Sequence, residues 1–263
     1  MKSHRRTVLT WTTCGLLVGG FCGCTAPMPP KAGRTTDERA RLVKPGMFDE
    51  GKAAADRRRI FFDFWNEQVI REDVAVGTVF LGDSITELWD LNVYFVPAEG
   101  LIENRGISGD LASHMARRFE ADVTQLRPRN VVILAGTNDV SAMIRQNRTD
   151  EEIIHDVTAS VVSMMDASRR AGIHTLVCSI LPTNSDYGMH ANRTKLRAAI
   201  NEKLKTACGE RGCIYVDYAA AMSDAHGDLR KDLARDGLHP HYAGYEIMAR
   251  VLNETAARHG LRF

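Results

Sequence analysis

The 263-residue sequence predicts one α/β domain, in which a parallel β-sheet is covered by helices on both faces. Short apolar segments alternate along the chain with longer segments whose apolar residues recur at helical spacing, as in βαβ units. The segment NVVILA at 130–135 is continuously apolar and β-branched, which is typical of a strand buried on both faces. Because no internal repeat is present, we expect a single three-layer α/β/α sandwich over residues 71–263.

The expected strands follow one another at intervals that leave room for crossover helices. They are TVFL at 78–81, LIEN at 101–104, NVVILA at 130–135, HTLVCSIL at 174–181 and CIYV at 213–216. The expected helices lie at 111–126 with Asp110 as N-cap, at 150–172, at 192–209, and from Pro240 to Gly260. A further helix over 52–70 has apolar residues at helical spacing and is expected to pack onto the sandwich.

The N-terminus differs in composition from the rest of the chain. A basic start, MKSHRR, precedes a run of mostly apolar or small residues that reaches Cys24, so residues 1–24 are interpreted as a secretory signal. FCGC at 21–24 resembles a loose lipobox, which predicts lipid attachment at Cys24 and a periplasmic or envelope location; an uncleaved anchor is the alternative. Residues 25–51 are rich in Pro, Gly and charge and are interpreted as a linker.

Composition narrows the possible functions. The net charge is +1, and the Lys and Arg residues are spread along the chain, so no nucleic-acid-binding surface is indicated. The sequence contains neither a CxxC pair nor HExxH, and we expect no metal and no cofactor. Cys208 and Cys213 flank GERG and are either a short-loop disulfide or two free thiols, while Cys178 is expected in the core.

Glycine and polar residues gather where the expected strands end. Three segments stand at strand ends: GDS at 82–84, NRGISGD at 104–110 and AGTND at 135–139. The fourth, DGLHPHYAG at 236–244, forms the loop before the last helix. Taken singly, each has a plain structural interpretation: a turn with a helix N-cap, a turn with positive φ at glycine, an Asx turn, and a simple turn. However, the carboxyl ends of parallel strands meet at one edge of a sheet, where ligands bind in such folds. We therefore expect the four segments to lie together.

Together these segments contain the groups that acyl transfer requires. Ser84 is the candidate nucleophile at a helix N-terminus, His239 the candidate base, and Asp236 the acid that orients the far ring nitrogen. The backbone N–H groups of Ser84 and Gly106 and the side-chain amide of Asn138 are the candidate donors of an oxyanion hole.

Two neighbouring residues compete with this assignment or support it. His241 is an alternative base, although we expect it in the first turn of the last helix. Asp83 is expected to make structural hydrogen bonds around the nucleophile loop. The GxSxG elbow is absent, which argues against the standard α/β-hydrolase pattern.

The four segments resemble, in order, the sequence blocks of the SGNH (GDSL) hydrolases over about residues 78–248. The matching stretches are GDSIT, NRGISGD, GTND and DGLHP. The resemblance implies a flavodoxin-like five-stranded parallel sheet. It also implies family roles for Ser84, Gly106, Asn138 and His239, with Asp236 as the orienting acid. NRGISGD and DGLHPHYAGY look most similar to the platelet-activating-factor acetylhydrolase-like bacterial esterases.

The sequence therefore predicts a serine esterase that hydrolyses short acyl esters, foremost O-acetyl, of a small molecule or carbohydrate. Two alternatives remain at this point. The same residues would serve an envelope glycan O-acyltransferase, and a non-catalytic envelope lipoprotein would keep the fold without the reaction. The motifs do not encode the alcohol part of the substrate or the oligomeric state.

Overall fold

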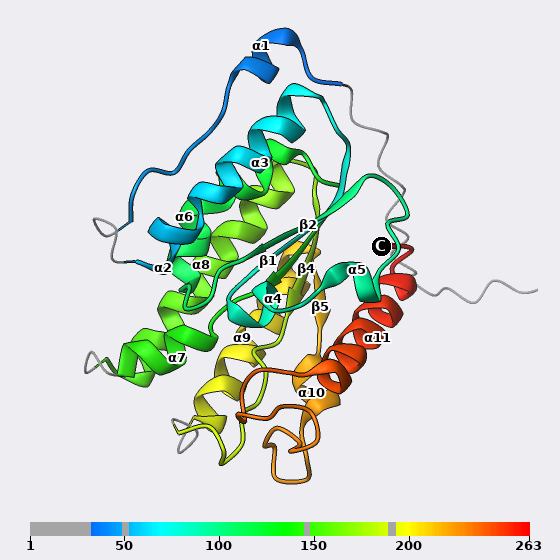
Figure 1. Cartoon of the computed structure of the whole chain (residues 1–263). Helices are drawn as coiled ribbons and strands as arrows, with labels where there is room; N and C mark the ends of the chain where they lie inside the picture. The colour runs from blue at the N-terminus through cyan, green and yellow to red at the C-terminus, as the bar shows by residue number, and fades with distance from the viewer. Residues whose placement is uncertain (1–32, 49–52, 145–147, 189–192) are drawn as a thin grey trace, which may run out of the picture.

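A five-stranded parallel sheet forms the centre of the molecule. The structure is a computed structural model that describes residues 33–48, 53–144, 148–188 and 193–263 (Figure 1). The strand order is β2-β1-β3-β4-β5, and every pairing is parallel. The bounds are β1 Val76–Gly82, β2 Leu101–Gly106, β3 Asn130–Leu134, β4 His174–Cys178 and β5 Ile214–Val216. This order is that of flavodoxin-like folds, and it confirms the predicted sandwich.

Helices cover both faces of the sheet because successive strand residues point to opposite sides. In β1, Val79 and Leu81 enter a core shared with the helices α3, α6, α8 and α9. Phe80 enters the second core, which α11 covers on the opposite face (Figure 1). The longer helices are α3 Ile60–Arg71, α6 Ala112–Asp122, α7 Thr137–Ile144, α8 Asp150–Arg170, α9 Thr194–Arg211 and α11 Tyr242–Arg258.

Short helical turns join these elements. They are α1 Thr36–Ala40, α2 Ala54–Arg58, α4 Ser84–Glu87, α5 Leu91–Tyr94, α10 Tyr218–Met222 and the 3₁₀ turn Thr124–Leu126. The helix expected at 52–70 is thus divided into α2 and α3, which meet at Arg59. Because α4 starts directly after β1, the first strand ends in a helical N-terminus, as the sequence predicted.

The stretch interpreted as a linker is described from residue 33 to residue 48. Arg34 forms an ion pair with Asp73 at 3.0 Å, and Gln125 hydrogen-bonds both backbone groups of Val43. A capping box between Thr35 and Glu38 starts α1. This part of the predicted linker therefore lies against the domain. The predicted signal and Cys24 lie outside the described residues, among which no helix is long and apolar enough to span a membrane.

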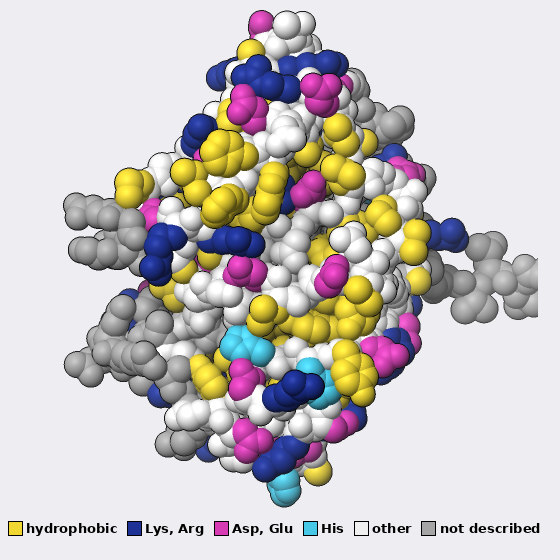
Figure 2. All heavy atoms as spheres, in the orientation of Figure 1, with side chains coloured by type: hydrophobic (Ala, Val, Ile, Leu, Met, Phe, Trp, Pro, Cys, Tyr) yellow, Lys and Arg dark blue, Asp and Glu magenta, His cyan; other side chains and the backbone are white. Residues whose placement is uncertain are grey.

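The outward face of α3 is apolar. Ile60, Phe61, Phe64 and Trp65 are all exposed, and hydrophobic side chains gather over this helix in the space-filling view (Figure 2). The opposite face of α3 is anchored by Phe62, which lies under the guanidinium of Arg105. Arg105 itself is buried between Glu103 and Asn66. Arg105 therefore joins β2 to α3 and does not face the carboxyl end of the sheet.

Two further predictions concern single residues. Cys178 lies in the core as expected, and Cys208 and Cys213 are free thiols in the structure. The expected N-cap of α6, Asp110, was wrong: Leu111 occupies that position and makes no side-chain cap. The Asp110 carboxylate instead accepts a hydrogen bond from the buried Arg118 guanidinium at 2.8 Å. A buried cation competes for a carboxylate more strongly than a helix terminus does.

Candidate active site

Ser84 stands at the carboxyl end of β1 as the first residue of α4. The preceding Asp83 is the N-cap, and its Oδ1 accepts a hydrogen bond from the backbone N–H of Ile85 at 2.9 Å. Glycine is required at position 82 because a Cβ there would lie 2.1 Å from Thr86 Oγ1 and 2.9 Å from Leu134 O. The tight packing of this turn holds Ser84, which is 8% exposed, at the edge of the sheet.

Ser84 contacts a histidine that lies 155 positions further along the chain. The Ser84 Oγ and His239 Nε2 atoms are 2.9 Å apart. On the other side of the ring, His239 Nδ1 and Asp236 Oδ2 are 2.6 Å apart. A carboxylate at Nδ1 keeps a proton there and leaves Nε2 free to accept the serine proton. The structure thus brings the three predicted residues into a hydrogen-bonded series.

The loop that presents His239 is built around Asp236. Oδ1 of this residue accepts hydrogen bonds from the backbone N–H groups of Leu238 and His239 at 3.0 and 2.7 Å. Gly237 has a φ of 74°, a conformation that glycine adopts without steric cost. The turn interpretation of Asp236-Gly237 is therefore correct, and the same turn aims Oδ2 at the histidine ring.

The electrostatics of Asp236 follow from this geometry. Partial burial raises the pKa of its carboxyl group, but hydrogen bonds from the His239 ring and from two backbone N–H groups outweigh burial. The net result is a lowered pKa, so Asp236 is ionised at neutral pH. An ionised Asp236 stabilises the imidazolium that forms when His239 takes a proton.

The competing histidine has a different task. His241 is the N-cap of α11, and its Nδ1 accepts a hydrogen bond from the backbone N–H of Ala243 at 3.2 Å. His241 was expected in the first turn of this helix, and it lies one position before that turn. With its ring committed to the helix terminus, His241 supports the position of α11, whereas His239 contacts Ser84.

The predicted oxyanion donors come from the ends of three neighbouring strands. Gly82 pairs with Gly106 on β2 and with Leu134 on β3, so these three strand ends are in register. The Ser84 N–H is at the first position of α4, where helical N–H groups have no partner within the helix. The Asn138 amide donates one hydrogen to Asp110 O at 3.0 Å and retains a second. The assignment of these donors stays a prediction.

Gly106 occupies a strand, so the alternative that it lies in a turn with positive φ was wrong. Glycine is needed there because a Cβ would lie 2.1 Å from the backbone nitrogen of Glu87 in α4. Its N–H donates to Asn104 Oδ1 at 2.9 Å, while the Asn104 amide donates to Thr86 O and Trp89 O. Asn104 therefore clamps α4 to β2, and the Gly106 N–H would have to turn from Asn104 to serve an oxyanion.

A buried polar network that the sequence did not reveal lies behind the nucleophile loop. We define it as Asp83, Asp110, Arg118, Asp122 and Asp139, each of which is at most 1% exposed. Arg118 donates to Asp110 and Asp122, and also to the carbonyl oxygens of Gly82 and Arg105 at 3.1 and 2.9 Å. Arg118 thus holds together the ends of β1 and β2.

Two carboxyl groups of the network have raised pKa values. The pKa of Asp83 is raised to about 7, chiefly by burial and in addition by the nearby Asp110 and Asp139 carboxylates, while a hydrogen bond from the Ile85 N–H opposes the increase. Burial likewise raises the pKa of Asp139 to about 6, although the Ala112 N–H donates to its carboxylate at 3.0 Å. Asp139 is thus the residue that receives the N-terminus of α6. The position of Asp139 in the GTND motif was a sequence signal for a role near the site. Nothing in the sequence distinguishes Arg118 from other arginines in a helix.

Comparison with known families agrees with the sequence motifs. The family described as GDSL-like Lipase/Acylhydrolase matches residues 80–247, which is more than half of the chain. This span contains Ser84, Gly106, Asn138, Asp236 and His239. No functionally curated protein matches the sequence.

Solved structures share the fold. A GDSL-like lipase from Bacteroides thetaiotaomicron is 25% identical, with a TM-score of 0.55 over 67% of this chain and 85% of that chain. A Streptococcus pneumonia protein provisionally described as a platelet activating factor is 20% identical, with a TM-score of 0.66 over 76% and 93%. An acetylxylan esterase from Geobacillus stearothermophilus is 22% identical, with a TM-score of 0.55 over 69% and 94%. At such identities the last two likenesses concern the fold alone.

Proposed function

Because this chain belongs to the GDSL-like lipase/acylhydrolase family and is an ester-hydrolysing enzyme, we propose that it removes short acyl groups, foremost O-acetyl, through an acyl-enzyme on Ser84. The observation that carries the proposal is the series Ser84 Oγ, His239 Nε2, His239 Nδ1 and Asp236 Oδ2, with separations of 2.9 and 2.6 Å. The substrates are esters of a small molecule or carbohydrate. The fold shared with an acetylxylan esterase is compatible with the carbohydrate class.

The first half of the reaction forms the acyl-enzyme. Ser84 Oγ attacks the ester carbonyl carbon while its proton passes to His239 Nε2, and the carbonyl electron pair moves onto oxygen. The Ser84 N–H and the Asn138 amide stabilise this oxyanion, and the Gly106 N–H joins them once Asn104 Oδ1 releases it. Collapse of the tetrahedral intermediate breaks the bond to the alcohol, which leaves with the proton that His239 returns.

The second half releases the acid. Water attacks the acyl carbon, His239 accepts a proton from that water, and the bond to Ser84 breaks as the proton returns to Oγ. Asp236 remains ionised throughout and stabilises the imidazolium in both halves. A sugar hydroxyl is chemically similar to water at this step, so acyl transfer to a glycan is the alternative outcome that an experiment must distinguish.

A labelling and product experiment tests the proposal. A fluorophosphonate probe should modify Ser84 in the wild-type protein, as located by peptide mass spectrometry, and should not modify Ser84→Ala. A series of 4-nitrophenyl esters from acetyl to decanoyl should give the highest kcat/KM for the shortest chains. A kcat/KM that rises steadily with chain length would contradict the short-acyl proposal, and transfer to an added sugar would indicate an acyltransferase.

We also propose that the protein is exported and bears lipid on Cys24. The support is the basic start, the apolar run and the cysteine in FCGC at 21–24. Mass spectrometry of the native protein should show a chain that begins at Cys24 and carries the mass of an attached lipid. An intact Met1 in the cytoplasmic fraction would end this proposal.

A further inference from the structure

Arg197 is a buried cation that no described side chain pairs with. The residue is 3% exposed, and neither Nε, Nη1 nor Nη2 has a hydrogen-bond partner among the described residues. The pKa of Arg197 is lowered to about 10, chiefly by burial and in addition by the nearby Arg193, while Tyr187 and Asp228 oppose the decrease. The guanidinium is therefore charged at neutral pH. Five buried N–H groups without acceptors destabilise a fold, which suggests that they serve a ligand.

The surroundings of Arg197 are positive. It lies in the first turn of α9, an 18-residue helix whose N-cap, Arg193, makes no side-chain cap bond. Arg193 Nε also has no hydrogen-bond partner among the described residues. Asp228 supplies one carboxylate, which accepts a hydrogen bond from Thr194 Oγ1 at 3.4 Å. The positive groups are the guanidinium groups of Arg193 and Arg197 and the N-terminus of α9, and the carboxylate of Asp228 opposes them. The resulting positive potential favours the binding of an anion.

This group of residues lies next to the catalytic edge of the sheet. Asn201, one helical turn after Arg197, hydrogen-bonds both backbone groups of Ile180, beyond the carboxyl end of β4. Ile180 in turn lies against Gly136, since a Cβ on that glycine would be 2.5 Å from Ile180 Cδ1. The face of α9 that carries Arg197 and Asn201 thus lies toward the ends of β3 and β4. Helix α7, which carries Asn138, follows β3.

Tyr187 connects Arg197 with the triad loop. A Cβ on Gly237, between Asp236 and His239, would lie 2.5 Å from the Tyr187 nitrogen. The Tyr187 hydroxyl is 3.2 Å from Ser141 Oγ, three residues after Asn138 on α7. Tyr187 therefore touches the elements that carry His239 and Asn138, and it is near enough to Arg197 to raise the pKa of that guanidinium.

We propose that Arg197 and Arg193, with the N-terminal turn of α9, bind a carboxylate or phosphate group of the substrate. The site selects anionic esters such as O-acetylated uronic acids or acetylated sugar phosphates over their neutral counterparts. A guanidinium is suited to this task because its planar N–H groups match carboxylate and phosphate oxygens in pairs. This inference rests on the proposed esterase function for its substrate class, but the binding of an anion does not depend on it.

Thermal unfolding with inorganic phosphate tests the site without any activity assay. Phosphate should raise the Tm of the full chain above its value in chloride at matched ionic strength, since a ligand that binds only the folded state stabilises it. Arg197→Met should lose this increase and be at least as stable in chloride, because an unpaired buried charge is removed. An equal response to phosphate in both proteins would overturn the inference.

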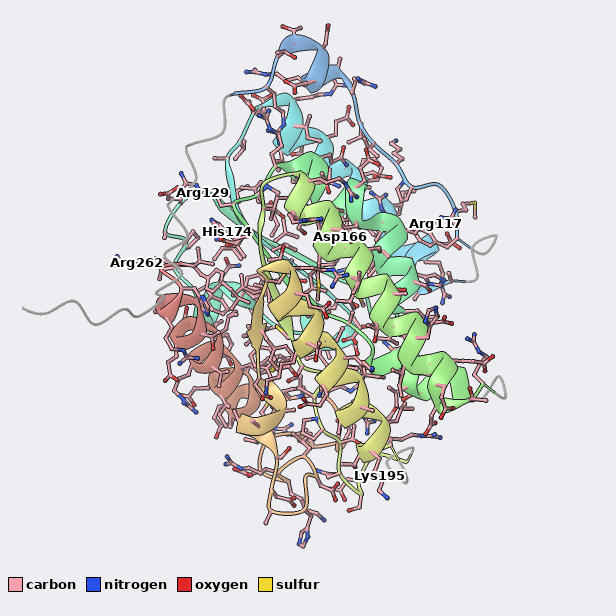
Figure 3. The ribbon with its side chains drawn as sticks, turned by 180° about the vertical axis from the view of Figure 1, so that it is seen from behind. Arg117, Arg129, Asp166, His174, Lys195 and Arg262 are labelled. Carbon is pink, nitrogen blue, oxygen red and sulfur yellow. The ribbon has the colours of Figure 1, made fainter. Side chains whose placement is uncertain are left out.

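Lys195→Met provides the matched control. Lys195 is exposed at the N-terminal end of α9, so its loss removes one positive charge from the same turn without touching Arg197 (Figure 3). It should keep the phosphate response. If Lys195→Met lost the response as fully as Arg197→Met, general charge and not a site would be responsible, and the inference would fail.

Substrate comparison then separates the two anions. The enzyme should be assayed on an O-acetyl hexuronic acid, an O-acetyl hexose phosphate and a neutral O-acetyl hexose. Arg197→Met should lower kcat/KM about 10- to 100-fold on the preferred anionic ester, mainly through KM, since hydrogen bonds to charged groups contribute about 1.5–3 kcal/mol. The loss of kcat/KM on the neutral ester should be much smaller than the loss on the anionic ester. Wild-type enzyme that cleaves the neutral ester without preferring either anion would overturn the inference and leave the esterase function standing.

Discussion

The loop of residues 234–240 and the buried polar network flank Ser84. Each contains an aspartate near the nucleophile, and the two environments shift the pKa of that carboxyl group in opposite directions. Asp236 in the loop has a 53% exposed side chain, accepts hydrogen bonds from His239 and Leu238, and has a lowered pKa. Asp83 in the network is fully buried among other acids, and its pKa is raised to about 7. Hydrogen-bond donors therefore favour the charge on one side of the nucleophile, and burial opposes it on the other.

The difference suggests a division of labour. In the proposed mechanism the exposed loop provides the proton transfers, because it holds His239 against Ser84 and the ionised Asp236 against the other ring nitrogen. The network provides position, because Arg118 joins the ends of β1 and β2 and Asp139 receives the N-terminus of α6. Four sets of substitutions test this contrast. The first affects His239 of the loop and its partner Ser84, where the largest loss of activity is expected.

The largest loss is expected when the proton-transfer pair is broken. Ser84→Ala and His239→Ala should each reduce kcat by on the order of 10⁴-fold or more, because the two residues act as one unit. The double variant should be hardly worse than either single one. Both variants should keep the wild-type circular dichroism spectrum, since neither belongs to the buried network. Should His241→Ala be inactive while His239→Ala retains activity, the assignment of the base would be wrong.

The second change removes the centre of the network. Arg118→Met leaves the buried Asp110 carboxylate without its guanidinium partner and Asp122 with Arg59 as its remaining ion-pair partner, so the free energy of unfolding should fall by about 3–5 kcal/mol. Urea unfolding followed by circular dichroism measures it. The matched control is Arg71→Met, which removes an exposed ion pair with Glu67 and should cost about 0–1 kcal/mol. Equal losses in the two variants would mean that Arg118 contributes no more than a surface charge.

The third change tests the oxyanion hole, where loop and network meet. The Asn138 amide donates to the backbone oxygen of Asp110, a network residue, and its second hydrogen has no partner among the described residues. Asn138→Ala should lower kcat about 10²- to 10³-fold with little change in KM, because the amide stabilises charge that develops only in the transition state. Steady-state kinetics on 4-nitrophenyl acetate measures both constants. A folded variant with unchanged kcat would remove Asn138 from the site.

The smallest effect concerns the pH dependence of stability. A carboxyl group whose folded pKa is raised binds more protons in the folded than in the unfolded state, so its contribution to stability is lost as pH rises toward the folded pKa. For Asp83, with a pKa of about 7 against an ordinary 3.8, about 2 kcal/mol should be lost between pH 5 and pH 7. Asp83→Asn should reduce the decline in unfolding free energy over this range.

The matched control for this last change is on the loop. The pKa of Asp236 is lowered, so its contribution should instead be lost as pH falls below the ordinary range, and Asp236→Asn should leave the decline from pH 5 to 7 unchanged. Urea unfolding of the three proteins at pH 5, 6 and 7 gives the comparison. Parallel pH curves for wild-type protein and Asp83→Asn would show that Asp83 does not titrate in this range.

The sequence by itself determined the elements and the chemistry at their ends. Short runs with apolar residues predicted all five strands, and one of them, NVVILA at 130–135, is continuously apolar and β-branched. Such runs are a local property of the sequence. Asp236 and His239 were assigned as partners because they are three positions apart, so a short turn suffices to bring them together. The failure at Asp110 has an equally local origin. Its position suited a helix cap, and only the fold revealed that Arg118, eight residues later, is buried beside it.

Only the tertiary structure decided which distant groups meet. The contact of Ser84 with His239 joins residues 155 positions apart and depends on the strand order that brings β1 and the loop before α11 to one edge. The burial of Arg118 and Arg197 had no sequence signal, because an arginine in a helix looks the same whether it faces water or the core. Burial is a property of what packs on a residue from elsewhere in the chain, and a buried cation matters for function because water no longer satisfies it.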